Sequence, residues 1–453
     1  MDEDIGRFYI DSVAIYCRRF RLSKMKYDSK VNGAQSWNVE FVGYSDLNGK
    51  PDSLQVVGQK IGSRQYLYVG HFWSGGVSIL DVTAPDNPQV IGFVPSPDPN
   101  TWNIKALVAD NLLVVPCELN FFLPALSGDG KYTPGIGFYD VSDPHAPKKL
   151  SFFKTGGWGA HRSWYDGGRY GFFSAGVDGV KGACSHGSEG ITRELLTLDL
   201  SNPAEPKPVS RFMLPGQLRH EPGSRWKTGD TYYVHEPVVA GKRAYVAYWD
   251  LGFAILDTSD LAHPEVISKY QHYPEKSGGN THTTLPLPDR NLLVVSDECT
   301  ANLCHEGPKY IWLFDIKDEE NPKPISTFPV PKPPPGSPYK DFCEKEDRFG
   351  PHCVHENRKG SKISSDTIYA TYCNAGLRIY DISNPHSPRE KGYFIPPDPE
   401  RIIDPRPYDR EFDIFHGGSR IVCTQDVYVD DRGYVYITDT NAGLYILKET
   451  KGS

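Results

Sequence analysis

The sequence predicts an all-β protein, a seven-bladed β-propeller, from its composition and from one strand pattern that recurs seven times. Its 453 residues include 43 Gly and 38 Pro, which end helices and mark turns. They also include 27 Tyr and 21 Phe, which favour strands. A chain of this length would ordinarily form two or three domains, but a repeat at a near-constant period indicates a single array.

The recurring pattern is a short apolar strand that ends in Asp and leads into a turn containing Pro. It ends at Asp81, Asp140, Asp199, Asp257, Asp315 and Asp381, and in a degenerate seventh copy at Lys448. Successive ends lie 59, 59, 58, 58, 66 and 67 residues apart. Each unit has a strand pair before the pattern and a further strand after it, and units of four short strands are typical of propeller blades.

The last unit lacks the strand that should follow Lys448, and the segment Asn38–Tyr44 resembles the outer strands of the other units. We therefore expect this N-terminal strand to complete the seventh blade and close the ring, which removes the exposed sheet edges of an open array. This expectation divides the chain into an N-terminal extension, residues 1–34, and a single propeller domain, residues 35–453.

The strand-Asp pattern with its Pro turn resembles the repeat of the LVIVD-repeat proteins, a family of β-propellers. The resemblance covers roughly residues 41–447, and the copy at Asp315 departs from it, with Lys317 where the others have Ser or Thr. It implies the propeller fold and little chemistry. Many relatives are exported, whereas Met1–Phe20 carries no export signal, so we expect a cytoplasmic location.

Charge and hydropathy argue against two classes of partner. The net charge of −8 argues against general nucleic-acid binding, which needs a basic surface. No run approaches the roughly 18 apolar residues that cross a bilayer.

Nine Cys without a C-x-x-C motif predict free, mostly buried thiols in a reducing compartment. A zinc site at the closest pair, Cys299 and Cys304, is the weaker alternative.

Four consecutive blades carry a His at the same predicted position, the start of the strand that lines the central channel. Measured back from the end of each second strand, the seven positions are Asp52, Asn103, His161, His235, His282, His355 and Gln425. Neighbouring inner strands bring such side chains together near the axis, and neutral imidazoles suit Fe, Cu, Mn or Zn. We therefore predict a metal ion held by His161, His235, His282 and His355, with His352 as a substitute ligand. The alternative is a water-filled channel lined by these His.

Other residues at the same end of the channel are candidates for catalysis and for substrate binding. The catalytic candidates are Glu236 and Glu356 to orient the ligands, Asp297 or Asp426 as general base, and Arg162 or Arg219 for an anion. The substrate-binding candidates are His71, Trp73, Tyr248, Trp249 and Tyr372, and Glu118, Asp250, Glu298 and Asn441 share the same loops. For Trp249 and Tyr372, packing between blades is an equal alternative.

These observations favour a metal-dependent enzyme that acts on a small organic substrate, as an oxidoreductase such as an oxygenase or as a Lewis-acid lyase or hydrolase. Carotenoid-cleavage oxygenases and selenium-binding/methanethiol-oxidase proteins are propellers that also hold a metal with axial His, which is an analogy of fold. The alternative is a non-catalytic scaffold for protein interaction or metabolite binding. The insertions 331–350 and 395–422 are candidate lids or partner-binding arms, and the N-terminal extension is a candidate contact with a second copy.

Overall fold

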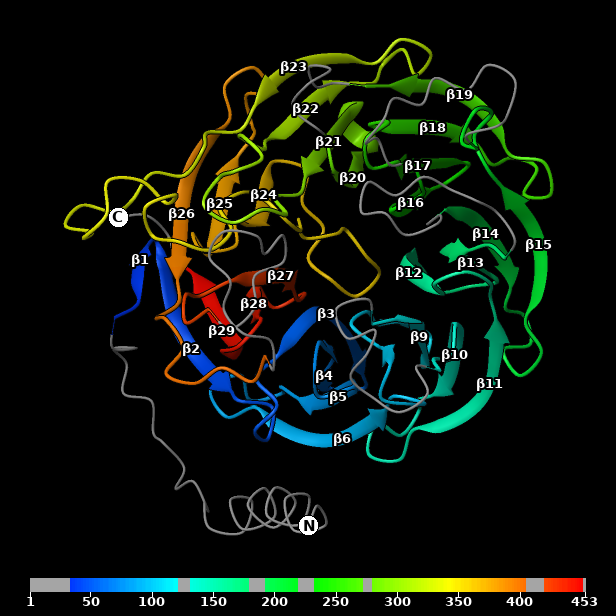
Figure 1. Ribbon diagram of the computed structural model, residues 1–453, viewed down its shortest axis with the longest axis horizontal. Coiled ribbons are helices and arrows are strands. Elements are labelled where there is room, and N and C mark those ends of the chain that lie inside the picture. Colours follow the sequence, from blue (N-terminus) through cyan, green and yellow to red (C-terminus); the bar gives the residue numbers. More distant parts are fainter. Residues whose placement is uncertain are drawn as a thin grey trace, which may run out of the picture.

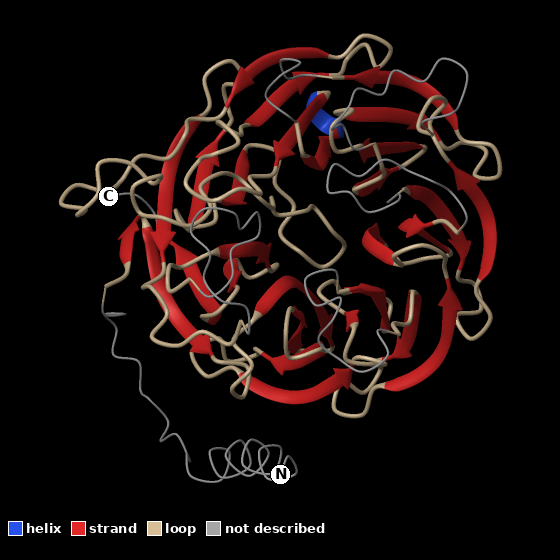
Figure 2. Ribbon diagram, in the orientation of Figure 1, coloured by secondary structure: helices blue, strands red, loops and turns tan. Residues whose placement is uncertain are grey.

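The structure is a computed structural model, and it describes residues 33–120, 131–178, 192–218, 232–271, 279–404 and 419–450. Seven antiparallel sheets stand around a central axis like the blades of a propeller (Figure 1). The described elements are strands apart from one short 3-10 turn, η1 (Pro288–Arg290), as the colouring of Figure 2 shows. The predicted seven-bladed β-propeller is therefore confirmed.

The strands of each blade follow one another from the channel outward. Blade 1 has β3 (Ser53–Ile61), β4 (Arg64–His71), β5 (Gly76–Asp81) and β6 (Gln89–Pro95), and blade 2 has β7 (Thr101–Trp102), β8 (Leu107–Ala109), β9 (Leu112–Leu119), β10 (Gly135–Asp140) and β11 (Lys148–Lys154). Blade 3 has β12 (Ala160–Trp164), β13 (Tyr170–Gly176), β14 (Arg193–Asp199) and β15 (Lys207–Phe212), and blade 4 has β16 (Glu236–Ala240), β17 (Arg243–Ala247), β18 (Phe253–Asp257) and β19 (Glu265–Tyr270). Blade 5 has β20 (Thr281–Leu287), β21 (Leu292–Asp297), β22 (Ile311–Asp315) and β23 (Lys323–Thr327). Blade 6 has β24 (Thr367–Thr371), β25 (Leu377–Asp381) and β26 (Arg389–Ile395), and residues 352–355 lie on the channel side of β24 as its inner segment, where Val354 pairs with Ala370. Blade 7 has β27 (Thr424–Val429), β28 (Tyr434–Asp439) and β29 (Gly443–Glu449).

The N-terminal segment closes the ring. Strand β2 (Val39–Ser45) pairs antiparallel with β29, from Val39 opposite Glu449 to Ser45 opposite Leu444, so it is the outer strand of blade 7. The predicted closure is confirmed. The sequence did not predict that the preceding strand, β1 (Gln35–Trp37), pairs with β26 and becomes the outer strand of blade 6. Residues 1–32 of the expected extension lie outside the described residues.

The repeated Asp caps the turn that follows it. In all six complete copies its Oδ1 accepts a backbone N–H from two residues further along, at 2.7–2.9 Å. At Asp315 the donor is the N–H of Lys317. Because the bond uses the backbone, the departure from Ser or Thr at this position leaves the turn intact.

Apolar residues on facing blades form the core. Between blades 4 and 5, for example, the buried rings of Phe253 and Phe314 meet edge to face with their centroids 5.1 Å apart. Such contacts fix the angle between adjacent blades, so they also fix the positions of the inner strands around the channel. Among the described residues no helix is long and apolar enough to span a membrane.

A loop of blade 6 closes one end of the channel. The turn before β24, residues 356–366, crosses the centre of the ring in Figure 1. Its Arg358 Nη1 donates to Tyr165 O of blade 3 at 3.1 Å, and its Lys362 N donates to Val429 O of blade 7 at 2.9 Å. First-to-second-strand turns and second-to-third-strand loops lie at opposite ends of a blade. The closing loop therefore lies at the end of the channel opposite the second-to-third-strand loops.

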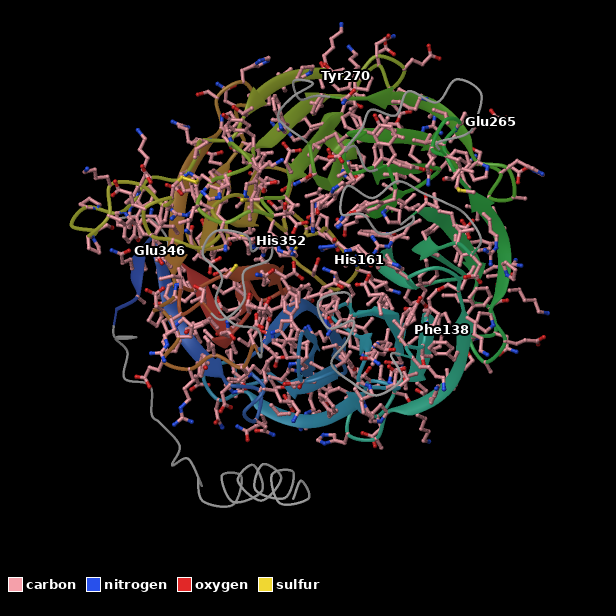
Figure 3. The ribbon with its side chains drawn as sticks, viewed as in Figure 1. Phe138, His161, Glu265, Tyr270, Glu346 and His352 are labelled. Carbon is pink, nitrogen blue, oxygen red and sulfur yellow. A yellow bond between two sulfur atoms is a disulfide. The ribbon has the colours of Figure 1, made fainter. Side chains whose placement is uncertain are left out.

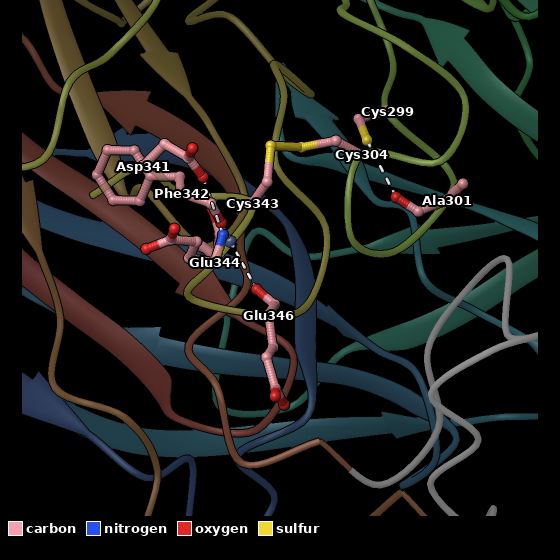
Figure 4. Close-up of a disulfide and its surroundings, with 9 residues drawn as sticks. Cys299, Ala301, Cys304, Asp341, Phe342, Cys343, Glu344 and Glu346 are labelled. Atoms are coloured by element: carbon pink, nitrogen blue, oxygen red, sulfur yellow. Dashed lines mark hydrogen bonds between the residues drawn. A yellow bond between two sulfur atoms is a disulfide. The ribbon is translucent and has the colours of Figure 1, made fainter. Parts of the chain in front are cut away.

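The insertion 331–350 is fastened to blade 5 by a disulfide between Cys343 and Cys304 (Figure 4). The prediction of free thiols is therefore wrong for this pair, because two segments 39 residues apart in sequence are neighbours in space. It holds for Cys117, Cys299, Cys353, Cys373 and Cys423, which are free and buried.

Candidate metal centre

Bulges in the inner strands turn consecutive side chains toward the channel. The pairing of β12 with β13 slips between Ala160 and Ser163, and that of β20 with β21 slips between Thr281 and Thr283. Inner strands of blades 1 and 7 slip at the corresponding place. A bulge places extra residues on one strand and re-aims them. Both His161 and Arg162 consequently reach the axis, although neighbours in a regular strand point to opposite faces.

Four imidazoles, those of His161, His235, His282 and His352, form an arc across the channel; we refer to them as the histidine cluster. The Nε2 atoms of His161 and His235 are 3.2 Å apart. The ring centroids of His235 and His282 are 4.4 Å apart, and those of His282 and His352 are 4.5 Å apart. Figure 3 shows His161 and His352 near the centre of the ring, while Glu265 and Tyr270 lie at its rim.

Each imidazole of the histidine cluster is held through Nδ1. Nδ1 of His235 donates to the carbonyl of His282 at 3.0 Å, and Nδ1 of His352 donates to the carbonyl of Gln425 at 2.7 Å. Nδ1 of His161 lies 2.6 Å from Oε1 of Glu118, and Nδ1 of His282 lies 2.7 Å from the hydroxyl of Thr283. A carbonyl only accepts, so the proton of His235 and of His352 sits on Nδ1. Their Nε2 atoms then carry a free lone pair.

Burial keeps the cluster neutral. It lowers the pKa of all four imidazoles well below the ordinary value, and the charges of Lys105 and nearby arginines lower it further. Neutral imidazole is the form that ligates metal ions.

Two carboxylates with Arg partners flank the cluster. Glu118 of β9 contacts His161 on one side and accepts from Nη2 of Arg193 at 3.0 Å. On the other side Glu298 accepts from Nη1 of Arg348 at 3.3 Å. Its Oε1 lies 3.6 Å from Nε2 of His352, and its Oε2 lies 3.9 Å from Nε2 of His282. Glu298 therefore faces the same space as the Nε2 atoms.

This arrangement fits a metal ion. Nε2 of His161 and Nε2 of His235 are at 3.2 Å, close to the roughly 3.0–3.4 Å expected for two imidazole nitrogens that each lie about 2.1 Å from one ion. Nε2 of His282 is buried and has no hydrogen-bond partner among the described residues. His235, His282 and Glu298 offer ligand atoms that all lie within 4.8 Å of one another. Two imidazoles and a carboxylate form a donor set typical of non-haem iron, and imidazole nitrogens also suit Cu, Mn and Zn.

The family comparison agrees with the repeat. The model of the LVIVD repeat matches residues 233–272 and 362–395, which lie in blades 4 and 6. The chain is therefore a β-propeller that carries LVIVD repeats. No curated protein matches it.

Two solved structures are similar over most of the chain. The β-propeller domain of Cps50 (Swd1) from Myceliophteria thermophila is 12% identical, with a TM-score of 0.50, over 88% of this chain and 97% of that one, and it shows the fold. The computationally designed Ika8 protein is 8% identical, with a TM-score of 0.45, over 90% of this chain and 98% of that one.

One predicted ligand of this LVIVD propeller lies elsewhere. Both ring nitrogens of His355 are engaged by backbone groups. Its Nε2 lies 2.8 Å from the carbonyl of Lys362, and its Nδ1 accepts the N–H of Val429 at 3.2 Å, so neither is available to bind a metal ion. His352 takes the place that the sequence suggested for His355. The N–H of His352 bonds to Thr371 O as the N–H of His235 bonds to Ala247 O.

The predicted alignment of blade 6 with the other blades is wrong at this position, because the turn between its first and second strands is longer than expected. His352 lies 22 residues before Asn374, whereas His235 lies 15 residues before Asp250, its equivalent. The extra residues form the loop that closes the channel. The difference of three positions between His352 and His355 was therefore hidden in the length of that loop.

Several predicted site residues lie below the cluster, on the side of the closing loop. Arg162 is fully buried and reaches from blade 3 to blade 6. Its Nε donates to Glu236 at 2.8 Å, its Nη1 donates to Sγ of Cys353 at 3.1 Å, and its Nη2 lies 3.5 Å from Glu356. Asp426 accepts the N–H of Val56 at 3.0 Å. These groups form a buried charged floor and do not orient the imidazoles.

Of the predicted substrate-binding residues, one borders the histidine cluster and two lie in the cores between blades. The indole of Trp249 lies 4.9 Å from the ring of His235 and stacks on Tyr233, so it borders the cluster. Tyr248 and Tyr372 instead lie fully buried in the cores between blades.

The remaining predicted residues are engaged away from the cluster. His71 is fully buried within blade 1, with its ring nitrogens near Asp52 and Ser78, and Trp73 packs against Trp102. Asp297 accepts from Nε1 of Trp312 at 2.8 Å. Arg219 and residues 405–418 of the second insertion lie outside the described residues.

Sequence reasoning gave no role to Glu118 or Glu298, although both stand on the loops it placed at the channel mouth. It did not single out Lys105 at all. The available signal was position: Glu118 lies near the end of the second strand of blade 2, and Glu298 directly follows the second strand of blade 5. Nothing in the sequence shows that a carboxylate at this place faces an imidazole from another blade.

Proposed function

We propose that this LVIVD propeller is a metal-dependent enzyme that acts on a small organic substrate. The ion would be held by the histidine cluster with Glu298 as an additional ligand. The observation that carries the proposal is the pair of Nε2 atoms of His161 and His235, 3.2 Å apart. Nε2 of His235 carries a lone pair, because its Nδ1 donates to a carbonyl. An ionised Glu118 would hold the proton of His161 on Nδ1, so that a second lone pair would face the first. A cation between them relieves that repulsion.

The donor set favours a transition metal, namely Fe, Cu, Mn or Zn, over Ca or Mg. A bound ion of this class would supply a Lewis acid or a redox centre. The protein would contribute orientation of the imidazoles through Glu118, Thr283 and two backbone carbonyls. It would also exclude water from below, because the charged floor and the closing loop fill that end of the channel.

A substrate would reach the cluster from the end of the channel opposite the closing loop. It would enter from the face of the second-to-third-strand loops and meet the stacked rings of Trp249 and Tyr233 beside His235. An apolar aromatic wall beside a polar centre suits a small organic molecule. The insertion 331–350 borders the same space, since its Arg348 pairs with Glu298.

The test is the metal content of full-length protein purified without chelator or His tag. We expect about one equivalent of Fe, Cu, Mn or Zn by elemental analysis, and loss of that metal in His235→Ala and His282→Ala. His355→Gln is the matched control, since it changes a buried His of the same channel that lies outside the cluster, and it should retain the metal. The proposal fails if wild-type protein loaded with each ion retains none, or if the two cluster variants retain as much as the control. Thermal unfolding of each variant verifies that it is folded.

A further inference from the structure

A pocket of about 250 Å³ lies beside the closing loop, on the face of the ring opposite the second-to-third-strand loops. Its walls are the ends of the inner strands of blades 3, 4 and 5, together with residues of the closing loop. This volume is close to the roughly 300 Å³ at which pockets for small organic molecules begin. The rim residues Asp289 and Ile363 are exposed, and no residue of the charged floor lines the pocket, so it opens to solvent.

The strand ends that line the pocket are apolar, unlike those that the closing loop contacts elsewhere. Lys359 of the loop places Nζ 2.6 Å from Oδ1 of Asp110 in blade 2, and its N–H donates to Asp166 in blade 3 at 2.6 Å. In blades 4 and 5 the corresponding ends carry Val238–Ala240 and Leu285–Leu287, which face the pocket. Contiguous apolar surface beside solvent is typical of a binding site.

Hydrogen bonds fix the loop side of the pocket. Nδ2 of Asn357 donates to the carbonyl of Ser364 at 2.9 Å, and the N–H of Ser364 donates to Oδ1 of Asn357 at 3.0 Å. Nη1 of Arg290 donates to the carbonyl of Ser365 at 2.7 Å, which ties the loop to blade 5. The pocket is therefore preformed, and binding would not have to order the segments around it.

One charged residue, Asp289, stands among those that line the pocket. Within the ranges that the structure describes, its carboxylate has no hydrogen-bond or ion-pair partner. The guanidinium of Arg290, which follows it in the chain, instead donates to the carbonyls of Ser365 and Ile382 at 2.7 and 2.9 Å. A ligand that fills the pocket would therefore place an apolar body against the strand ends and a positive group beside Asp289.

We propose that this pocket binds a small amphiphilic amine, a molecule with an aliphatic body and one ammonium group. The body packs against Val239, Leu285 and Ile363, and the ammonium pairs with Asp289. The lining offers no cation to a carboxylate or phosphate, so it disfavours anions of the same size. No residue of the histidine cluster lines the pocket, and the inference does not depend on the proposed metal ion.

The test is a ligand-observed NMR titration of full-length protein at pH 7 with butylamine, hexylamine and octylamine, which are protonated at that pH. We expect the affinity to rise about 4-fold with each methylene that the pocket buries. Hexanol and hexanoate should bind about 2- to 5-fold more weakly than hexylamine, because neither pairs with Asp289.

Variants locate the binding. Ala240→Trp places an indole in the pocket and should abolish hexylamine binding, whereas Leu150→Trp, at an exposed position on the outer strand of blade 2, should leave it unchanged. Asp289→Asn should reduce the affinity for hexylamine to that for hexanol. Glu265→Gln removes another exposed carboxylate, at the rim of the ring in Figure 3, and should not.

Equal affinity for hexylamine, hexanol and hexanoate would overturn the proposal, and so would binding that survives Ala240→Trp. A dimer in light scattering that Ala240→Trp dissociates would also overturn it, because a second copy of the chain would then occupy the pocket. Thermal unfolding verifies that each variant is folded. If Ala240→Trp is not, Ile363→Ser at a 65% exposed position replaces it and should weaken hexylamine binding about 3-fold or more; unchanged binding there contradicts the proposal.

Discussion

Glu118 is the side chain whose removal should weaken metal binding without removing a ligand. Its Oε1 lies 2.6 Å from Nδ1 of His161, and it is 1% exposed. Burial raises the pKa of Glu118 to about 7, although Arg193 and Lys105 oppose the rise. At pH 8 the carboxylate is therefore ionised and its bond to His161 is charge-assisted. Glu118→Gln keeps one acceptor oxygen and the size of the side chain but loses the charge.

Two estimates of the effect agree. A hydrogen bond to a charged group contributes about 1.5–3 kcal/mol when buried. Loss of a partner that orients a metal-bound His costs about 10- to 100-fold in metal affinity, or about 1.4–2.7 kcal/mol. Because Gln can still accept from Nδ1, we expect the lower part of this range, a Kd raised about 10-fold.

The assay is a competition titration of metal-free protein with Co(II) at pH 8. Glu194→Gln is the control. Glu194 lies in blade 3, is buried as Glu118 is, and pairs with Arg211 at 2.7 Å, away from the imidazoles. Its Kd should equal that of wild type. A Kd for Glu118→Gln within about twofold of wild type would refute the idea that this carboxylate positions a ligand. Equal weakening in both variants would assign the effect to folding.

Three further predictions concern stability. Asp52→Ala removes an acceptor for an imidazole, a hydroxyl and two backbone N–H groups, and should cost about 3 kcal/mol in urea unfolding at pH 7. Burial raises the pKa of Asp52, but these bonds lower it more, to below its ordinary value. The ionised carboxylate therefore stabilises the fold fully above pH about 4, and this stabilisation decreases as the pH falls further. The cost of Asp52→Ala should accordingly be smaller when unfolding is measured at pH 3. Gly159→Ala should lower the melting temperature and the Co(II) affinity, because a Cβ at position 159 would lie 2.2 Å from a carbonyl oxygen of blade 2. Gly168 also has a positive φ, but a Cβ there would meet no other atom. Gly168→Ala should therefore change only the stability, by about 1 kcal/mol. Replacing Cys304 and Cys343 by Ser should cost up to about 4 kcal/mol, from the 39-residue loop that the disulfide closes, and an unchanged unfolding free energy under non-reducing conditions would contradict this.

The sequence by itself determined the architecture. A strand that ends in Asp at near-constant spacing identifies a blade, since the Asp caps the next turn through the backbone and the pattern survives even where Lys317 replaces Ser or Thr. The missing outer strand of the last blade and the spare strand before the first one predict closure, and β2 confirms it. These features are local, so they are visible in a linear chain.

The tertiary structure decided the composition of the site. Whether His352 or His355 reaches the axis depends on a loop that crosses the ring and on bulges that rotate the inner strands, and neither has a sequence period. Glu118, Glu298 and Lys105 become neighbours of the cluster only because inner strands from different blades converge at the axis. Periodicity records which residues share a face of a strand. The distance between side chains of separate blades is set by how the blades pack, and that information lies in the fold.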